Sequence, residues 1–205
     1  TNLPNANSYG SMFADKVPAW KYGGEACVID IRHLLDAAPK GVSPLVRIEH
    51  IKAWERQHRP LGEGDVVLLY AGYADKYYKP FPEGRRFLID PLSKKTPAWP
   101  DPHPECMEYI AQQGVRHIAV DSPSMGPIPN LAEPTHIAGL KYGAIFTEGA
   151  KGFGQLPPTG TFYCCVGPRH SLSPCAEGRA LAVTDTKAAR FLINASRKKS
   201  VIDLS

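Results

Sequence analysis

Residues 116–124 read RHIAVDSPS, a short apolar run that ends in a polar turn. An uninterrupted apolar run followed by turn residues is typical of a strand that is buried on both faces. Two similar runs precede it in the chain, EACVIDIRHLL at 25–35 and DVVLLYAGY at 65–73. We therefore predict buried strands within all three segments, at 26–31, at 66–71, and in RHIAVDSPS up to the turn at Asp121, Ser122 and Pro123.

Segments with helical signals lie between and after these strands. Apolar residues recur at about helical spacing in 43–58, with Ser43 or Pro44 as the start, and 103–115 predicts a short helix. Residues 184–199 predict a longer helix, whose inner face would carry Ala188, Phe191 and Leu192. The alternation predicts an α/β fold, and the later apolar segments GAIFTEG, GTFYCCVG and ALAVTD predict added β structure.

Proline sets residues 79–104 apart from the rest of the chain. This segment, KPFPEGRRFLIDPLSKKTPAWPDPHP, holds seven prolines. Proline fixes φ and removes a backbone donor, so we expect a long loop without regular elements, used as a lid or an oligomer arm. The whole chain has 20 Pro and 18 Gly, which argues against a helix bundle.

Composition excludes several classes of protein. The 205 residues carry 24 Lys and Arg against 20 Asp and Glu, a net charge of +4 without a concentrated basic patch. This pattern predicts no binding to nucleic acid. No apolar stretch approaches the length of a spanning helix, and residues 1–11 do not resemble a signal peptide. We expect a globular protein that is not associated with a membrane.

The five cysteines form no recognisable framework. They are an odd number, include the adjacent pair Cys164 and Cys165, and contain no CxxC. This pattern fits neither paired disulfides nor a zinc ribbon. We expect reduced thiols and a cytoplasmic protein.

One histidine and one glutamate have the context of a metal site. His136 follows the turn-rich DSPSMGPIPNLAEPT, whose prolines predict a stiff loop, and Glu148 lies twelve residues later inside an apolar strand. A carboxylate there needs a partner or a cation. An imidazole and a carboxylate together suit Zn²⁺ or Mn²⁺.

Asp121 ends the third predicted strand. Ligands gather at the carboxyl ends of strands in an open α/β sheet, so Asp121 is a candidate pocket residue. An Asx-turn, in which the aspartate bonds its own backbone, is the simpler interpretation.

The two ends of the sequence suggest other possibilities. Thr1 could be the nucleophile of an N-terminal-threonine hydrolase, with its own amine as the base. The final SVIDLS, around 200–205, predicts either an edge strand or the start of a further domain. A chain that opens in a loop and closes in a strand suggests a piece of a longer polypeptide.

The order of segments resembles the cyclase-like family of metal-dependent hydrolases, which includes kynurenine formamidases and isatin hydrolases. The matching segments are GGEACVIDIRHL, GEGDVVLLYAGYADKYY, QGVRHIAVDSPSM, EPTHIAGLKYGAIFTEGAKGFGQLPPTG and SPCAEGRALAV, which together cover roughly residues 13–183. The resemblance implies a swivelling β/β/α fold and hydrolysis of amide, cyclic amide or lactone bonds. His136 falls on a family histidine and Glu148 on an acidic position where many members place a metal ligand.

The sequence departs from the family in one important respect. The HxGTHxDxPxH signature, which supplies most of the family's metal ligands, is absent from residues 1–205. The closing VIDLS resembles the family's own first strand. We therefore expect residues 1–199 to be an incomplete cyclase-like domain, whose other ligands come from another segment, a second copy or a complementary chain.

In this interpretation the metal polarises the substrate carbonyl and activates a bound water. His136 is a ligand or a proton shuttle, and Glu148 binds the metal or holds the water. Aromatic residues of the Pro-rich segment could wall a pocket for a small-molecule substrate or pack against another subunit: Phe81, Phe87 and Trp99. The alternative is a non-catalytic structural half of a degenerate pair.

Overall fold

A mixed sheet organises the chain. The computed structural model describes residues 13–171, 173 and 175–201. Within this part, six strands lie in the order β6 (Ile145–Thr147), β5 (His117–Val120), β3 (Asp65–Tyr70), β1 (Gly23–Asp30), β7 (Phe162–Val166) and β8 (Arg179–Val183). The first four are parallel, and β7 and β8 each run antiparallel to the preceding neighbour. The predicted α/β fold with a mixed sheet is confirmed.

Side-chain alternation along the central strands divides the core into two parts. In β1, Cys27 and Ile29 pack in a main core with α1 (Ile48–Gln57), α4 (Pro104–Gln112) and α5 (Ala132–Leu140). Ala26 and Val28 face the other side of the sheet. Because successive strand residues point to opposite faces, apolar residues at every position produce a strand that is buried on both sides.

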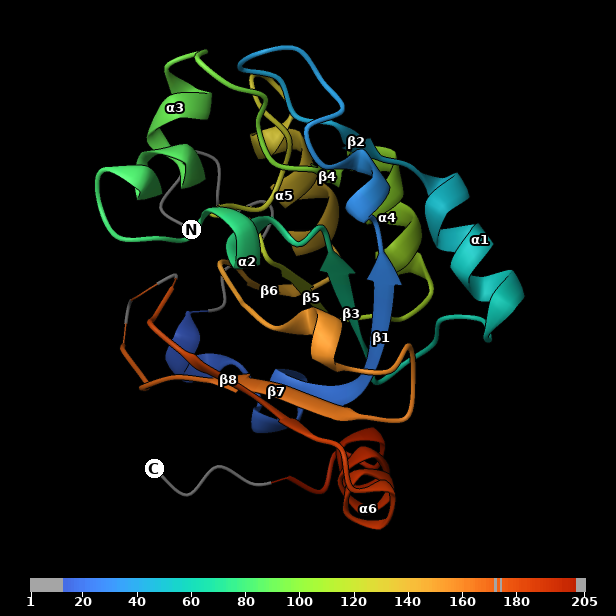
Figure 1. Cartoon of the computed structure of the whole chain (residues 1–205). Coiled ribbons are helices and arrows are strands. Elements are labelled where there is room, and N and C mark those ends of the chain that lie inside the picture. Colours follow the sequence, from blue (N-terminus) through green and yellow to red (C-terminus); the bar gives the residue numbers. More distant parts are fainter. Residues whose placement is uncertain (1–12, 172, 174, 202–205) are drawn as a thin grey trace.

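The helices cover the two faces unequally. In Figure 1, α1, α4 and α5 gather on one side of the parallel strands, with α2 (Tyr73–Tyr77) and α3 (Ile89–Leu92) above their carboxyl ends. The second face is closed by the short helix η6 (Phe153–Gln155) together with Tyr163 of β7. The sheet also curls, so that β7 and β8 lie across the lower part of the view.

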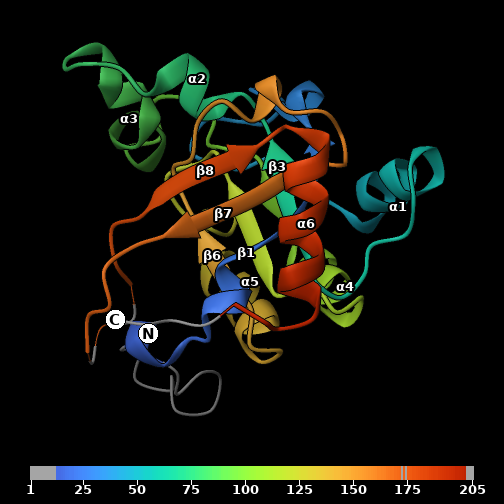
Figure 2. The same cartoon turned by 90° about the horizontal axis from the view of Figure 1, so that it is seen from below.

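The last helix, α6 (Thr186–Arg197), begins after Asp185, whose side chain accepts the Ala188 N–H. It packs on β1 and β7 (Figure 2). Its buried face carries Ala189, Ile193 and Ser196. The predicted inner face was wrong, since Phe191 is 73% exposed. The Ser196 hydroxyl, bonded to the Trp20 and Gly23 carbonyls, helps to fix this rotation.

The proline-rich segment contains regular structure, contrary to the sequence prediction. It forms η5 (Glu83–Phe87), α3, and strand β4 (Asp101–Pro102), which pairs with β2 (Leu45–Val46). Prolines occupy the first turns of α3 and α4, where a missing N–H leaves no intrahelical bond unmade. Strand β2 also occupies part of the predicted helix 43–58, so that α1 begins only at Ile48.

Three further short helices complete the described elements: η2 (Ala14–Lys16), η3 (Ala19–Tyr22) and η4 (Arg32–Leu34). The five cysteines are all unpaired thiols. No helix in the described residues is both long and apolar enough to cross a membrane. Thr1 and residues 202–205, on which two sequence hypotheses depend, lie outside the described residues.

Candidate functional site

Two acidic residues leave the sheet at the carboxyl ends of neighbouring parallel strands. Asp121 follows β5 and Glu148 follows β6, and the two strands pair in register through Ala119 and Thr147. Glu148 therefore lies just beyond the end of β6. The sequence pattern had predicted that it lies inside the strand. Its side chain is 37% exposed, so the carboxylate keeps part of its hydration.

His136 approaches Glu148 from the helical side of the molecule. It lies in α5, and not on the stiff loop that the nearby prolines predicted, because Pro134 fits within the first turn of this helix. The His136 Nδ1 is 2.8 Å from the Ala132 carbonyl oxygen, which can only accept a hydrogen bond. Nδ1 therefore carries a proton, and Nε2 is the ring nitrogen that faces Glu148, 3.7 Å from its Oε1.

The partners of Glu148 and His136 set their electrostatics. The Met125 N–H donates to Glu148 Oε1 at 2.6 Å, and the Phe146 ring meets the imidazole edge-on at 5.5 Å between centroids. Burial by itself lowers the pKa of His136, but the Glu148 carboxylate and the Ala132 carbonyl outweigh it, so the pKa is raised above its ordinary value.

The donor types at this site are suitable for a divalent cation. A neutral imidazole offers the Nε2 lone pair, and a carboxylate held through one oxygen leaves the other available. Among the described residues, however, no group of three or more His, Cys, Asp and Glu side chains is arranged to hold a metal ion. His136 and Glu148 thus supply two donors, fewer than a stable zinc or manganese site uses.

Asp121 has a different environment. Its side chain accepts the Ala71 N–H at 3.3 Å and the Tyr73 N–H at 3.1 Å, where β3 passes into α2. Burial raises the pKa of Asp121 to about 7, and these N–H groups oppose that rise. The carboxyl therefore anchors the turn between β3 and α2 and not its own backbone, as an Asx-turn would require. Its place in a substrate pocket stays a prediction.

The three aromatic residues proposed for the pocket lie in three environments. Phe81 is 74% exposed. Phe87 is partly buried and packs against the rings of Tyr73 and Tyr78. Trp99 is only 2% exposed and belongs to the main core.

Sequence reasoning missed Asp101, a fully buried acid close to this site. The Ser122 hydroxyl lies 3.3 Å from Asp101 Oδ1. Nothing in the local pattern indicates it, because Asp101 stands among prolines in the segment that was expected to be a loop.

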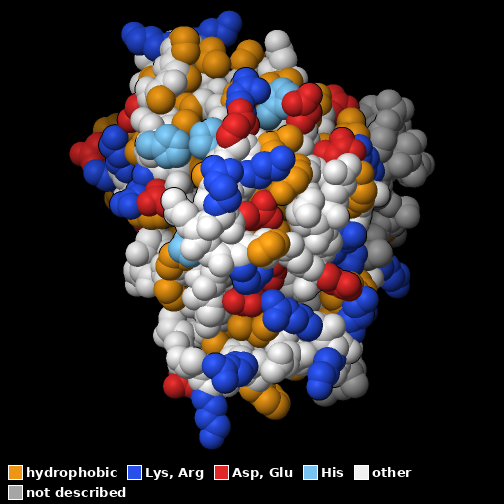
Figure 3. All heavy atoms as spheres, turned by 90° about the vertical axis from the view of Figure 1, so that its right-hand side faces the viewer, with side chains coloured by type: hydrophobic (Ala, Val, Ile, Leu, Met, Phe, Trp, Pro, Cys, Tyr) orange, Lys and Arg blue, Asp and Glu red, His pale blue; other side chains and the backbone are white. Residues whose placement is uncertain are grey.

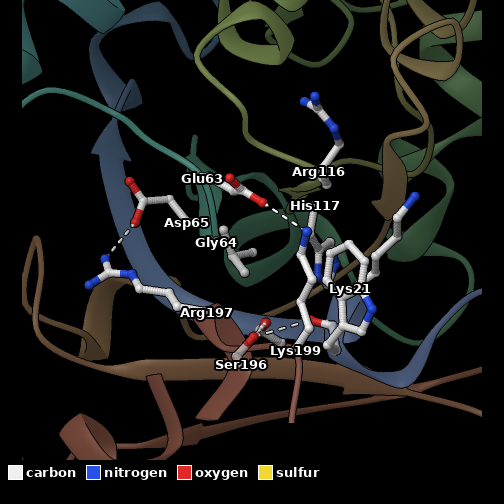
Figure 4. Close-up of a pocket in the computed structure, with 12 residues that line it drawn as sticks. Lys21, Glu63, Gly64, Asp65, Arg116, His117, Ser196, Arg197 and Lys199 are labelled. Carbon is white, nitrogen blue, oxygen red and sulfur yellow. Dashed lines mark hydrogen bonds and ion pairs between the residues drawn. The ribbon is translucent and has the colours of Figure 1, made fainter. Parts of the chain in front are cut away.

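A separate hollow lies at the amino ends of the parallel strands, opposite the candidate site (Figure 4). Gly23, Asp65 and His117, the first residues of β1, β3 and β5, line it together with residues of η3 and α6. Its charged groups are largely satisfied within the protein. Arg197 pairs with Asp65, Lys199 pairs with Glu63, and Lys21 donates to the Gly143 carbonyl.

The molecular surface carries mixed charge. On the face in Figure 3, Lys and Arg side chains alternate with Asp and Glu side chains and do not form a continuous basic area. The mixture agrees with the composition, and on this face it offers no electrostatic footprint for a nucleic acid.

The chain matches the family described as "Putative cyclase" over residues 4–127, more than half of its length. It therefore belongs to this cyclase family, and the resemblance stated from the sequence is confirmed. No curated protein matches the chain.

Solved structures with the same fold are isatin hydrolases and related proteins. Isatin hydrolase A from Ralstonia solanacearum has a TM-score of 0.71 and 19% identity, over 88% of this chain and 67% of that one. Isatin hydrolase A from Labrenzia aggregata, bound to benzyl benzoate, has a TM-score of 0.69 and 19% identity, with 90% and 68% covered. A protein described as a potential metal-dependent hydrolase with cyclase activity has a TM-score of 0.58 and 18% identity, over 84% of this chain and 70% of that one. The chain thus spans about two thirds of the length of these proteins.

Proposed function

We propose that this chain is part of a metal-dependent hydrolase that acts on an amide, cyclic amide or lactone bond. The observation that carries the proposal is the approach of His136 Nε2 to Glu148 Oε1 at the carboxyl edge of the sheet. Family membership and the fold shared with proteins described as isatin hydrolases support it.

His136 and Glu148 would hold the cation, Zn²⁺ or Mn²⁺. Such an ion lowers the pKa of a bound water and polarises a carbonyl when it is present. The Ala132 carbonyl keeps the proton of His136 on Nδ1, which directs the Nε2 lone pair toward the site. The Met125 N–H fixes one oxygen of Glu148 and thereby orients the other.

The remaining ligands would come from another segment, from a second copy of the chain or from a complementary chain. The two donors found here are too few for a complete site, which is the reason for this part of the proposal. The substrate would be a small molecule with a carbonyl group.

The test is metal analysis of the protein in its complete assembly. We expect stoichiometric Zn or Mn in the unaltered protein, and loss of metal and of hydrolysis in His136→Ala and Glu148→Gln. His170→Ala is the matched control, because His170 is an exposed residue of the loop between β7 and β8. An assembly that keeps its metal and its activity after both site substitutions would refute the proposal.

A second candidate is a structural, non-catalytic half of a degenerate pair. It is favoured by the absence of a three-ligand cluster in the part of the chain that the structure describes. It predicts no bound metal in the complete assembly. Both candidates differ from the N-terminal-threonine hydrolase, in which Thr1→Ala alone would abolish turnover.

A further inference from the structure

Asp101 is the most deeply buried acid near the candidate site. It lies in β4, where its N–H donates to the Pro44 carbonyl, and its exposed fraction is 0%. Among the described residues no Lys, Arg or His forms an ion pair with it, and its Oδ2 has no hydrogen-bond partner. An ionised carboxylate in this position would lack both water and a counter-charge, which is strongly unfavourable.

The contacts of Ser122 bear on the protonation state of Asp101 independently of its burial. Ser122 Oγ is 3.3 Å from Asp101 Oδ1 and 3.0 Å from the Ser124 carbonyl oxygen. A hydroxyl has a single proton, and a carbonyl can only accept. If Ser122 donates to Ser124, the other contact is a hydrogen bond only when Asp101 supplies its own proton.

The same turn holds Glu148. The Met125 N–H donates to Glu148 Oε1 at 2.6 Å, and the Gly149 N–H donates to the Ser122 carbonyl at 2.7 Å. The turn 122–125 thus contacts the side chain of Glu148 and the backbone of the next residue. A contact that holds Ser122 in place therefore also holds the Met125 N–H, which orients the Glu148 carboxylate.

We propose that Asp101 is a positioning residue for the His136–Glu148 site, a neutral carboxylic acid that donates its proton to Ser122 Oγ and so stabilises the turn that holds Glu148. This inference rests on the proposed function for its biological meaning, but its chemistry concerns the metal-free chain.

The electrostatic surroundings agree with this assignment. Burial raises the pKa of Asp101 well above its usual range, and the carboxylates of Glu148 and Asp121 raise it further. The Gly126 N–H only partly opposes this rise, as would the Ser122 hydroxyl in the alternative arrangement in which it donates to Asp101. His136, the other titratable group at the site, faces Glu148.

The experiment uses the full chain without metal at neutral pH. Infrared difference spectra should show carbonyl bands of buried protonated carboxyl groups, one of which disappears in Asp101→Asn and another, from Asp121, in Asp121→Asn. Both bands should persist in Asp90→Asn, a control from the same segment whose side chain is 23% exposed and pairs with Arg85. Amide hydrogen exchange should leave Met125 and Gly149 protected in Asp101→Asn, because the Asn NH₂ can donate to Ser122 in place of the acid.

In Asp101→Ala, exchange at both amides should accelerate by about tenfold or more as the turn opens locally. Ser122→Ala should have the same effect, and it serves as the second variant if Asp101→Ala does not fold. Unchanged exchange in Ser122→Ala, or a protonated-carboxyl spectrum that is identical in Asp101→Asn and the unaltered protein, would overturn the proposal.

Zn²⁺ titration of the complete assembly separates this inference from the proposed function. Asp101→Asn should bind Zn²⁺ as the unaltered protein does, while Glu148→Gln should not. If Asp101→Asn loses Zn²⁺ as completely as Glu148→Gln, Asp101 is an ionised ligand, and the positioning role is wrong although the metal site stands. If neither substitution affects binding, the proposed metal site fails while the infrared and exchange results still decide the role of Asp101.

Discussion

The acids at the two ends of the parallel strands have different partners. At the amino end, Asp65 meets two guanidinium groups, Arg59 at 2.7 Å and Arg197 at 3.2 Å. At the carboxyl end, Asp121 meets only backbone N–H groups, and Glu148 meets an N–H and an imidazole. The acid at the amino end is thus neutralised by fixed arginines, whereas the acids at the carboxyl end are held by backbone N–H groups and one imidazole.

Strand β5 shows the same contrast within a few residues. His117 at its start is buried, with Nε2 against Thr147 Oγ1 at 2.8 Å, and Asp121 is buried just after its end. Burial lowers the pKa of His117 to about 4 and raises the pKa of Asp121 to about 7. Burial therefore favours the neutral form of both groups. The neutral form of His117 is the deprotonated one, present above its pKa, and the neutral form of Asp121 is the protonated one, present below its pKa.

The largest effect should follow from breaking the paired end. Asp65→Ala removes the more buried of the two acids that Arg59 and Arg197 share, since the Asp65 side chain is 1% exposed and Glu25 also pairs with both arginines. We expect the free energy of unfolding to fall by about 3–5 kcal/mol, which is typical of a buried pair that loses one partner. Urea unfolding measures this, and a loss of less than about 1 kcal/mol would show that the amino end is not electrostatically locked.

At the carboxyl end, stability should depend on pH through Asp121. Its pKa rises from 3.8 in the unfolded chain to about 7 in the folded one, so its contribution is complete below about pH 4 and is lost as pH rises through about 7. The shift corresponds to up to about 4 kcal/mol. Unfolding in urea across this range should show a decline that becomes smaller in Asp121→Asn. If the free energy of unfolding of Asp121→Asn declines with pH as steeply as that of the unaltered protein, groups other than Asp121 cause the decline.

His117 should make the free energy of unfolding fall at the acid side of the pH range. Its pKa falls from 6.5 to about 4 on folding, so its contribution is complete above about pH 6.5 and is lost as pH falls toward 4. The shift corresponds to about 3 kcal/mol. His117→Gln, which can still bond to Thr147, should remove this acid-side loss. If acid sensitivity persists in His117→Gln, other groups control unfolding at low pH.

These contrasts also show what the sequence could predict. The central strands were predictable because Val67, Ile118 and their neighbours form short uninterrupted apolar runs, which are typical of strands buried on both faces. The pairing of His136 with Glu148 was implied by the family resemblance, and their proximity in space agrees with it. The helical setting of His136 was not predicted, because prolines were interpreted as breakers even where a first turn accepts them.

The chemistry around Asp101 could not be predicted for a different reason. Its hydroxyl partner, Ser122, is 21 residues away in sequence and comes from another strand end. Whether an acid is ionised depends on such distant groups and on complete burial, and neither leaves a local pattern. The face of α6 was missed similarly, because hydrogen bonds from Ser196 to the remote Trp20 and Gly23 carbonyls help to set it.

The smallest effect should come from Glu63, two residues before Asp65 in the same hollow. Its partner Lys199 is 3.2 Å away, but the two side chains are 71% and 51% exposed, so water screens their attraction. We expect Glu63→Ala to change the free energy of unfolding by less than about 1 kcal/mol, with any loss reduced further by salt. Asp65→Ala and Glu63→Ala each remove one negative charge from the same hollow, so their difference in urea unfolding compares a buried acid with several partners and an exposed acid with one. Equal losses for the two would mean that charge count, and not the exclusion of water, stabilises the amino end of the sheet.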